Sequence, residues 1–375
     1  MLKKMWLAIL WGLLVSVLVV ALAMVGTARV QAAPGTIREL APPHAPASTP
    51  QKWLVYNIAL GLPLYVQLGN KVRVPQLLTF FADEDADVIV LIEAFDQGSR
   101  EMLLDGLRQQ GYTQWIGGCD SKIVHNGIYI GAKQKIEFVD QMIFQEAVSS
   151  DIFSAKGAIL CRVGDQYLAA IHMQSWESKI HWDIRHAQMK SLMKWLEPYP
   201  NTIVCGDFNV DPDSHEMSRW EGDFRYQILP KMGSLKDYAT SDLLGIDGEC
   251  MLYVCLSISI DSLFMQTGTA MDYSCETDFY SNVCWSVEKP GLCTLGSRKD
   301  QHRSRRNCEC CPAYQLVWAL RTGEDPLPTG WHIETVNAKA KEEMQFGMWR
   351  IGWLVSPEIR TRDLSDHLPV RITLA

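Results

Sequence analysis

The stretch TIVCGDFNV, residues 202–210, joins an apolar run to two polar side chains. Residues 202–205 are uncharged and mostly β-branched, which predicts a buried strand. Asp207 and Asn209 follow this strand, and in an extended backbone residues two apart point to the same side. If the backbone there is extended, both side chains can address one phosphate or one water molecule. Taken alone, Gly-Asp-x-Asn is also the pattern of an ordinary turn.

Four other apolar runs carry polar residues at their ends. They are VYNIAL with Asn57, VIVLIEAF with Glu93, LAAIHMQS with His172, and LSDHLPV with Asp366 and His367. A carboxylate that follows five apolar residues, as Glu93 does, loses solvation unless a cation or hydrogen bonds compensate. This favours a ligand for a hard metal ion over a helix cap or a salt bridge. Singly, His172 is typical of a hydrogen-bonded core histidine and His367 of a surface turn, but their joint occurrence favours one site.

The rest of the chain alternates apolar runs of strand length with helical patterns. Strands are predicted at 53–60, 87–95, 127–131, 158–163, 166–173, 202–205, 349–355 and 369–374. Apolar residues at three-and-four spacing predict helices at 74–82, 99–110 and 180–197. The alternation indicates a mixed α/β fold.

Residues 215–345 interrupt this alternation with a scattered apolar pattern. They hold five cysteines within 28 residues, namely Cys284, Cys293, Cys308, Cys310 and Cys311. Cys308 and Cys311 form a C-x-x-C pair, but no second pair or histidine at finger spacing follows, which favours disulfides over zinc. We expect a cysteine-rich insertion within a domain that spans residues 53–375, with its disulfide connectivity open.

The N-terminus predicts export. Two lysines precede an uncharged apolar run at residues 6–25, which is long enough to cross a bilayer as a helix. Val30-Gln31-Ala32 followed by Ala33 also suits a signal peptidase, so residues 1–33 are a signal peptide or a signal anchor. Residues 34–52 are rich in Pro, Ala, Ser and Thr and predict an extended tether. The folded part is then membrane-anchored on the non-cytoplasmic side, or secreted or periplasmic.

Composition and missing motifs exclude several classes of protein. A hydrophobic content of 47% excludes a disordered chain. The 35 Lys and Arg against 43 Asp and Glu give a net charge of −8, so no overall positive field attracts nucleic acid. The chain lacks G-x-S-x-G, P-loop and G-x-G-x-x-G motifs, which leaves serine hydrolase, NTPase and dinucleotide readings without support. Residues 207–218 open like an EF-hand loop, but Pro212 and Ser218 replace its turn glycine and final glutamate.

In chain order, these strand-end residues resemble the site of the endonuclease/exonuclease/phosphatase superfamily. That site has an early Asn, a Glu in an LQE-like segment, a His in a T-x-H-like context, GDFN, and a final SDH, and all five are present in order. The resemblance covers residues 53–212 and 348–375. It implies a two-sheet α/β sandwich flanked by helices.

Two further segments are similar to those of neutral sphingomyelinases within this superfamily. SSDIFSAKGAI, residues 149–159, places Asp151 five residues before Lys156, like the Asp and Lys pair of those enzymes, and EAFDQGSREMLLDGL is similar to their second segment. A solvated loop ion pair is the alternative. The resemblance implies Mg²⁺-dependent hydrolysis of sphingomyelin-like phosphodiesters to ceramide and phosphocholine. The partner would be a membrane phospholipid substrate, with no obligate protein partner evident and nucleic acid disfavoured.

The chemistry of phosphodiester hydrolysis assigns roles to the metal and the base. Glu93 and Asn57 supply oxygen ligands of the kind that Mg²⁺ prefers. His367 is the expected general base, because an unperturbed imidazole pKa of about 6.5 leaves it largely neutral near pH 7. Asp366 or Asp207 would orient this histidine and balance its developing charge.

The remaining residues are assigned to the phosphoryl group and the water. His172 and Asn209 would donate hydrogen bonds to a phosphoryl oxygen, and Asp207 would help to place the water. By resemblance, Asp151 and Lys156 would arrange the catalytic loop once lipid is engaged. Aromatic faces at Trp176, Trp182 and Tyr65 would suit a choline-type headgroup, with core packing as the alternative.

One departure from the family pattern leaves two rival functions open. Family members carry an Asp in an Arg/Leu-x-Asp-Tyr strand before the final SDH, where this chain has Gly352, and Asp272 is a candidate replacement. Loss of that carboxylate would suit a degenerate membrane-tethered binding protein. The basic residues at 298–306 would suit an exported nuclease on the same scaffold, or a solvated loop.

Overall fold

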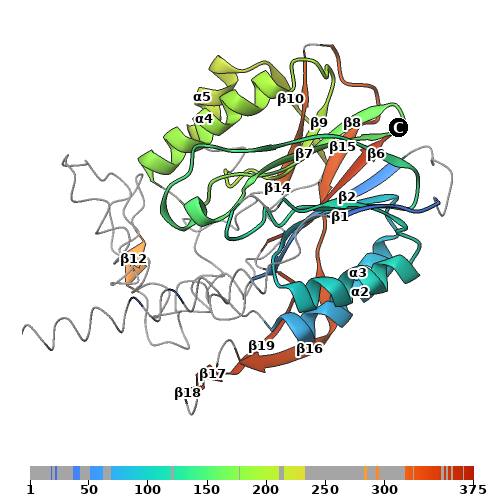
Figure 1. Cartoon of the computed structure of the whole chain (residues 1–375), viewed down its shortest axis with the longest axis vertical. Coiled ribbons are helices and arrows are strands. Elements are labelled where there is room, and N and C mark those ends of the chain that lie inside the picture. The colour runs from blue at the N-terminus through green and yellow to red at the C-terminus, as the bar shows by residue number, and fades with distance from the viewer. Residues whose placement is uncertain are drawn as a thin grey trace, which may run out of the picture.

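The computed structural model shows two β-sheets stacked face to face, with helices on the outside (Figure 1). It describes residues 18, 22, 37–42, 51–61, 69–119, 122–176, 178–210, 215–232, 283–284, 293–294, 317–323, 325–347, 350–351, 354–355, 358–365 and 367–375. Within this part of the chain, no helix combines the length and the apolarity needed to cross a bilayer. The predicted α/β sandwich is confirmed.

The first sheet has eight strands and mixes parallel with antiparallel pairs. In spatial order they are β1 (Ile37–Leu40), β4 (Gln114–Gly117), β5 (Tyr129–Ala132), β3 (Val88–Ala94), β2 (Gln51–Leu60), β20 (Val370–Leu374), β15 (His332–Thr335) and β11 (Lys231–Met232). The central strands β2 and β3 run parallel. Their carboxyl ends therefore reach the same edge of the sheet, which brings Asn57 and Glu93 to one place.

The second sheet has six strands. In spatial order they are β10 (Tyr226–Ile228), β14 (Val317–Thr322), β9 (Ile203–Asp207), β8 (Gln166–His172), β7 (Gly157–Val163) and β6 (Ile136–Ile143). Strands β8 and β9 run parallel, with His172 directly opposite Asp207 at their ends. The register thus sets a histidine beside a carboxylate.

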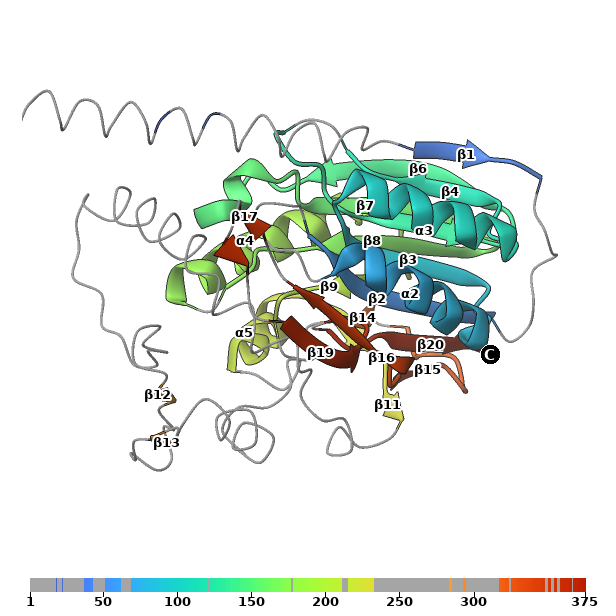
Figure 2. The ribbon, with the colours of Figure 1, turned by 90° about the horizontal axis from the view of Figure 1, so that it is seen from below.

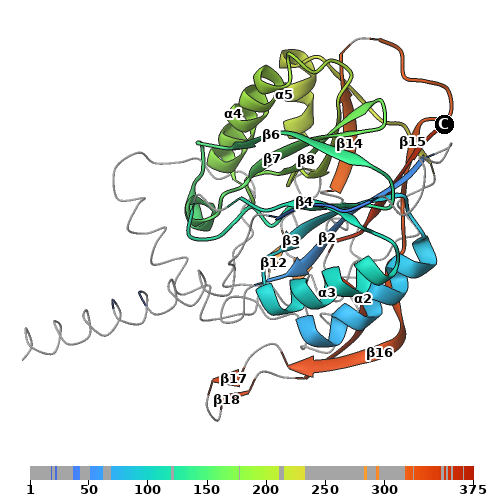
Figure 3. The same ribbon diagram turned by 45° about the vertical axis from the view of Figure 1, so that its right-hand side comes forward.

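Four helices cover the outer faces of the sandwich. Helices α2 (Asn70–Glu84) and α3 (Gln97–Gln109) lie together on the first sheet, and α4 (Lys179–Trp195) and α5 (His215–Asp223) on the second (Figure 3). Helix α3 begins where the side chain of Asp96 accepts the Ser99 N–H at 3.1 Å, which is an N-cap. A short 3₁₀ helix, η1 (Ser149–Phe153), precedes β7.

Alternation along the strands divides the apolar residues between two cores. Trp53 and Val55 of β2 face the second sheet, whereas Leu54 and Tyr56 pack under α2 and α3. This is the two-residue period of a strand that is buried on both faces. The second sheet contributes strands with the same near-continuous burial, so the site is built on rigid, fully packed elements.

The expected tether at 34–52 is wrong in part. Residues 37–40 form β1, which pairs antiparallel with β4, and β2 already begins at Gln51. Without β1, the backbone N–H and C=O groups at the edge of β4 would be unpaired, and a short segment can pair with them whatever its side chains are. The amino-acid composition of residues 34–52 does not reveal that part of this segment pairs with a distant strand.

The expected insertion at 215–345 is also too wide. Helix α5 and strands β10, β11, β14 and β15 come from this range and belong to the sandwich itself. Strand β14 lies next to β9 at the centre of the second sheet, with Trp318 opposite Gly206. These elements are short and irregularly spaced, which hides their period in the sequence.

Smaller strand pairs account for the remaining described segments. Strand β16 (Lys339–Gly347) pairs with β19 (Glu358–Asp363) beside α2 (Figure 2), and β12 (Val283–Cys284) pairs with β13 (Cys293–Thr294). The single strand expected at 349–355 is wrong, because β17 (Arg350–Ile351) and β18 (Leu354–Val355) form an antiparallel pair instead. An apolar run of this length is equally compatible with one strand and with two short strands of a hairpin, so hydropathy does not distinguish them.

The described cysteine side chains are free thiols. Cys119, Cys161 and Cys205 are buried and unbridged. In the backbone of β12 and β13, Cys284 stands directly opposite Cys293. The disulfides expected in the insertion lie outside the side chains that the structure describes.

Candidate active site

The ends of strands from both sheets meet at one place between them. The side-chain Nδ2 of Asn57, from β2, donates to Glu93 Oε1 at 3.0 Å and to Asp207 Oδ2 at 2.8 Å. Asn57 and Asp207 are fully buried, and they lie 150 residues apart in the chain. One amide therefore ties the carboxylates of the two sheets together.

Three side chains at these strand ends form a cluster that has the residue types of a cation site. Glu93, His172 and Asp207 each present one ligand atom, and these atoms lie within 4.8 Å of one another. The Nε2 atom of His172 is buried without a hydrogen-bond partner and lies 3.8 Å from Glu93 Oε1. Two carboxylates beside an imidazole whose Nε2 has no hydrogen-bond partner fit a divalent cation. Glu93 is 25% exposed, so the cluster is open to solvent on its side.

Asn57 presents its amide to this cluster through nitrogen. Its Oδ1 accepts the Ala59 N–H at 3.1 Å, while Nδ2 faces the two carboxylates. In this orientation the amide N–H groups compensate the negative charge of the two carboxylates. Ligation through Oδ1 requires the amide to turn over, a change that leaves its shape the same.

His172 is held neutral by its surroundings. Burial lowers its pKa well below the ordinary value, and the nearby Lys156 ammonium lowers it further. Its Nδ1 lies 3.4 Å from the carbonyl oxygen of Asn126, which assigns the proton of the neutral ring to Nδ1. In that tautomer Nε2 offers a lone pair toward Glu93, which suits a cation ligand. Donation to a phosphoryl oxygen needs the proton on Nε2.

His367 comes to Asp207 from the last segment of the chain. Its Nε2 lies 3.5 Å from Asp207 Oδ2, and its side chain is 11% exposed. The Ser365 hydroxyl donates to the carbonyl of Asn57 at 2.7 Å and accepts the His367 N–H at 3.3 Å. Sequence reasoning missed Ser365, although it belongs to the same SDH triplet. Among the described residues, Asp207 presents a carboxylate to this imidazole, and Asp366 lies outside them.

The GDFN segment adopts the turn that its pattern also allows. Asn209 has a φ of 53°, and its N–H donates to Asp207 Oδ1 at 2.8 Å. Its side-chain Nδ2 donates to the carbonyl of Met173 at 3.0 Å. Of the two geometries that the sequence left open, the turn is observed and not the extended backbone, because the aspartate closes a local turn of its own backbone. Both residues still lie at the site.

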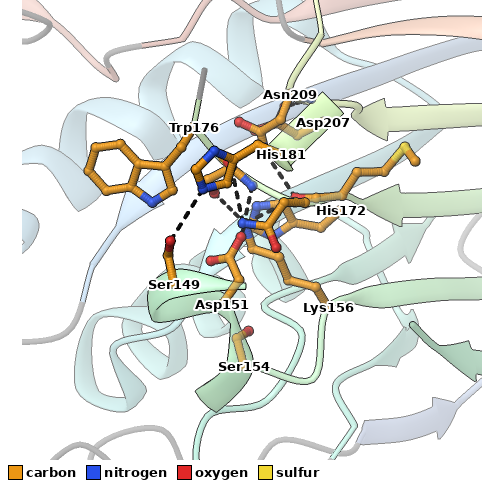
Figure 4. Close-up of polar contacts among 12 residues, drawn as sticks. Ser149, Asp151, Ser154, Lys156, His172, Trp176, His181, Asp207 and Asn209 are labelled. Carbon is orange, nitrogen blue, oxygen red and sulfur yellow. Dashed lines mark hydrogen bonds and ion pairs between the residues drawn. The ribbon is translucent and has the colours of Figure 1, made fainter. Parts of the chain in front are cut away.

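Asp151 and Lys156 form a buried ion pair next to this cluster (Figure 4). Lys156 Nζ lies 2.9 Å from Asp151 Oδ2 and donates to the carbonyl of Met173 at 3.0 Å and to the Ser175 hydroxyl. The Ser175 N–H donates to Asp151 Oδ2 at 2.7 Å. The pair is only 7% and 6% exposed, so the solvated-loop alternative is wrong. It fastens η1 to the end of β8.

A third histidine lies on the outer side of this ion pair. His181 lies beside Ser149 (Figure 4). Its Nε2 is 3.2 Å from the Ser149 hydroxyl, and its Nδ1 is 2.6 Å from the Ser178 hydroxyl. Burial, and then the Arg185 guanidinium, lower the pKa of His181 to about 4. Sequence reasoning missed this residue. Its only signal was a histidine in the first turn of a predicted helix.

The candidate aromatic residues divide between surface and helix. Trp176 is 40% exposed, in the loop after β8, with a φ of 77°. Trp182 is partly buried in α4. Six predicted residues meet at the site: Asn57, Glu93, His172, Asp207, Asn209 and His367. The positions outside the described residues are Tyr65, Asp272, the basic stretch 298–306, Gly352 and Asp366.

Curated relatives of this chain are sphingomyelinases. It is 28% identical over 189 residues to Sphingomyelinase C 2 of Leptospira interrogans serogroup Icterohaemorrhagiae serovar Lai (strain 56601), covering 43% of this chain and 30% of the relative. It is 27% identical over 195 residues to Sphingomyelinase C of Leptospira interrogans, covering 44% and 35%. The chain thus spans about a third of the length of these relatives.

Solved structures of similar fold cover most of this chain. SmcL has a TM-score of 0.56 at 18% identity, with 87% of this chain and 99% of SmcL covered. Sphingomyelinase C from Streptomyces griseocarneus has a TM-score of 0.53 at 18% identity, with 88% and 100% covered. A beta toxin from Staphylococcus aureus with bound magnesium ions has a TM-score of 0.54 at 16% identity, with 87% and 100% covered. At these identities the similarity establishes the fold.

The family itself is established at the level of sequence. Residues 54–282, more than half of the chain, match the model of the Endonuclease/Exonuclease/phosphatase family. That range includes the strand ends that bring Asn57, Glu93, His172 and Asp207 together. The resemblance seen in the ordered motifs is confirmed, and this chain belongs to the Endonuclease/Exonuclease/phosphatase family.

Proposed function

We propose that this protein is an exported phosphodiesterase that hydrolyses sphingomyelin-like lipids to ceramide and phosphocholine, with Mg²⁺ as cofactor. The observation that carries the proposal is the cluster of Glu93, His172 and Asp207, with His367 Nε2 3.5 Å from Asp207. It joins a cation site to an imidazole positioned to act as a base. The sphingomyelinases among its relatives support the lipid substrate.

The cation would be held by Glu93 and by Asn57 after its amide turns over. The carboxylate of Glu93 and the amide oxygen of Asn57 are hard ligands, and the Asn57 amide already lies within hydrogen-bond distance of Glu93. When bound, the cation supplies a Lewis acid that polarises a phosphoryl oxygen and neutralises developing charge.

His367 is the proposed general base. Its neutral ring takes a proton from the attacking water, and Asp207, fully buried, stabilises the imidazolium that results. The fixed contact of Ser365 with Asn57 keeps the base close to the strand that carries the metal ligand. The reacting groups are thereby held at a constant distance, which is the main advantage of a preorganised site.

His172 and Asn209 are proposed to face the phosphoryl group. His172 donates if the ring proton moves to Nε2, and Asn209 has a second amide hydrogen besides the one that Met173 accepts. The Asp151 and Lys156 pair is proposed to hold the loop after β8 in place once lipid is engaged. Met173 links it to the site, because its carbonyl accepts from both Lys156 and Asn209.

Release of phosphocholine from mixed micelles of sphingomyelin tests the proposal. The protein with Mg²⁺ is expected to release it, and Mg²⁺ removal, His367→Ala and Glu93→Ala are each expected to lower the rate at least about 100-fold. Two variants serve as matched controls. His186→Ala changes a partly buried histidine on α4, and Glu101→Ala an exposed glutamate on α3.

Three results would contradict this function. Equal release by all variants would exclude the assigned site. No release from any form, with the cation still bound, would favour a degenerate binding protein. Cleavage of DNA that falls steeply with added salt, without release of phosphocholine, would favour a nuclease.

A further inference from the structure

Two buried arginines, one on each helix that covers the first sheet, bind the backbone at the ends of β2 and β3. Arg73 of α2 is 0% exposed and Arg100 of α3 is 1% exposed. A buried guanidinium is costly unless its donors are satisfied. Both side chains donate to main-chain carbonyls of the turns that carry site residues.

Arg73 joins the end of β2 to the segment that carries His367. Its Nη1 donates to the carbonyls of Ile58 at 2.9 Å and Leu364 at 2.5 Å, and its Nη2 donates to the carbonyl of Ala59. Ile58 follows Asn57 directly, and Leu364 comes three residues before His367. Arg73 and Leu364 are 291 residues apart in the chain. One guanidinium therefore holds the segment that carries His367 against the end of β2, which carries Asn57.

Arg100 acts in the same way at the end of β3. Its Nη1 donates to the carbonyls of Ala94 at 3.1 Å and Phe95 at 3.0 Å, the two residues that follow Glu93. The same nitrogen lies 2.9 Å from His125 Nε2, and the guanidinium carbon lies 5.2 Å from the centre of the Tyr129 ring. Arg100 thus connects the Glu93 turn to the segment around His125.

That segment in turn holds His172. The carbonyl of Asn126, next to His125, lies 3.4 Å from His172 Nδ1. The Phe95 ring is close to both imidazoles, with its centre 5.7 Å from that of His125 and 6.2 Å from that of His172. Gly127, with a φ of 72°, allows the Phe95 ring to lie close to its backbone, because a Cβ there would be 2.7 Å from that ring. Arg100 is therefore linked to both Glu93 and His172.

The turns that the two arginines bind include backbone in the left-handed region. Ala59 has a φ of 45° and Glu93 a φ of 60°, conformations that are unfavourable for residues other than glycine. Surrounding contacts must hold them. The planar fork of a guanidinium binds two or three carbonyls at fixed angles, whereas a lysine ammonium does not reproduce that geometry.

We propose that Arg73 and Arg100 are positioning residues of the site, Arg73 for His367 and Arg100 for Glu93 and His172. The roles of those three residues rest on the proposed function. The positioning of each imidazole by one arginine does not depend on that function, because it is a property of the structure alone.

Imidazole NMR signals of histidine-labelled protein without cation test the division of labour. The signals are assigned with His367→Ala and His172→Ala. Arg73→Lys is expected to move the His367 signal and leave that of His172 in place, and Arg100→Lys is expected to do the reverse. Arg321→Lys is the matched control, since this arginine is also buried and its Nη1 donates to a main-chain carbonyl, that of Asp325 at 2.8 Å, in a segment that carries no site residue, and it should move neither signal.

Kinetics provide the second measurement. Each lysine variant is expected to lower kcat about 10- to 100-fold with KM nearly unchanged, because displacement of a reacting group acts on the chemical step. If the unsubstituted protein hydrolyses no sphingomyelin, the proposed function fails while the NMR comparison still decides this inference.

Three outcomes would overturn it. Either variant moving both signals would indicate a general loosening of the fold, and neither variant moving its expected signal would exclude positioning. If a lysine variant does not fold, Arg73→Gln or Arg100→Gln takes its place. Failure of both substitutions at one position to fold would assign that arginine a purely structural role.

Discussion

At the scale of single residues, the site depends on ionisable groups that are buried. Asp207 is fully enclosed, Lys156 and Asp151 compensate each other, and His172 is neutral. A buried charge is stable only when a partner or hydrogen bonds replace its water. Substitution of one partner is therefore expected to cost more than the pair itself contributes.

The Asp151 and Lys156 pair gives the first prediction. Asp151→Asn leaves the Lys156 ammonium buried without its countercharge and is expected to lower the free energy of unfolding by about 3–5 kcal/mol. Asp183→Asn on α4 is the matched control, because Asp183 is 47% exposed in its pairs with Lys179 and Arg219. It should cost less than about 1 kcal/mol. Urea unfolding at neutral pH measures both, and equal losses would contradict the buried pair.

Buried histidines give the second prediction. Burial lowers the pKa of His125 to about 3 and of His181 to about 4, and it lowers that of His172 as well. Below pH about 6.5 the unfolded chain binds protons that the folded chain does not bind, so stability is expected to fall as pH falls.

Urea unfolding at several pH values between about 6.5 and 5 measures this slope, a window above most carboxyl titrations. His181→Gln should make the slope shallower, because one lowered pKa is removed. Thr79→Ala on α2 is the control, because it removes a hydroxyl and no titratable group, and it should leave the slope unchanged. A slope that is the same in all three proteins would contradict the assignment.

At the scale of elements, parallel pairing at the centre of each sheet assembles the site. Strands β2 and β3 align Asn57 with Glu93, and β8 and β9 align His172 with Asp207. The β8 and β9 pair requires glycine at position 206. Gly206 has a φ of 143°, and a Cβ there would lie 2.1 Å from the carbonyl oxygen of Ile171.

Gly206→Ala is therefore expected to push β9 away from β8 and to lower the free energy of unfolding by about 3 kcal/mol or more. Gly98→Ala in α3 is the matched control, because no atom lies within 4 Å of its added Cβ. Alanine there should leave stability unchanged or raise it by up to about 1 kcal/mol. Thermal and urea unfolding compare the two, and a tolerated Gly206→Ala would show that the strands separate without cost.

At the scale of the whole molecule, the proposed cation site lies where the two sheets meet. Binding of a cation there stabilises both sheets together, because the unfolded chain lacks the site. At about 100 times its dissociation constant, Mg²⁺ is expected to raise the free energy of unfolding by about 2.7 kcal/mol. Glu93→Ala should abolish this increase and Glu101→Ala should retain it. Unfolding curves with and without Mg²⁺ measure the difference, and an increase that survives Glu93→Ala would place the cation elsewhere.

The sequence by itself determined which residues stand at the ends of buried strands, their order, and the family to which they belong. These properties are local, because hydropathy and residue type can be read within a few positions. It also indicated the principal helices, although Ser365, His181 and the two positioning arginines carried too little local signal.

Only the tertiary structure decided which strand ends meet. The pairing of β14 with β9 and of β15 with β20 joins distant segments, so no local pattern could reveal it. The same holds for β1, whose partner strand lies beyond the predicted tether. Long-range pairing depends on the backbone groups that remain unsatisfied when the whole sheet forms, and the packing of the two sheets face to face then brings Asn57 within 2.8 Å of Asp207.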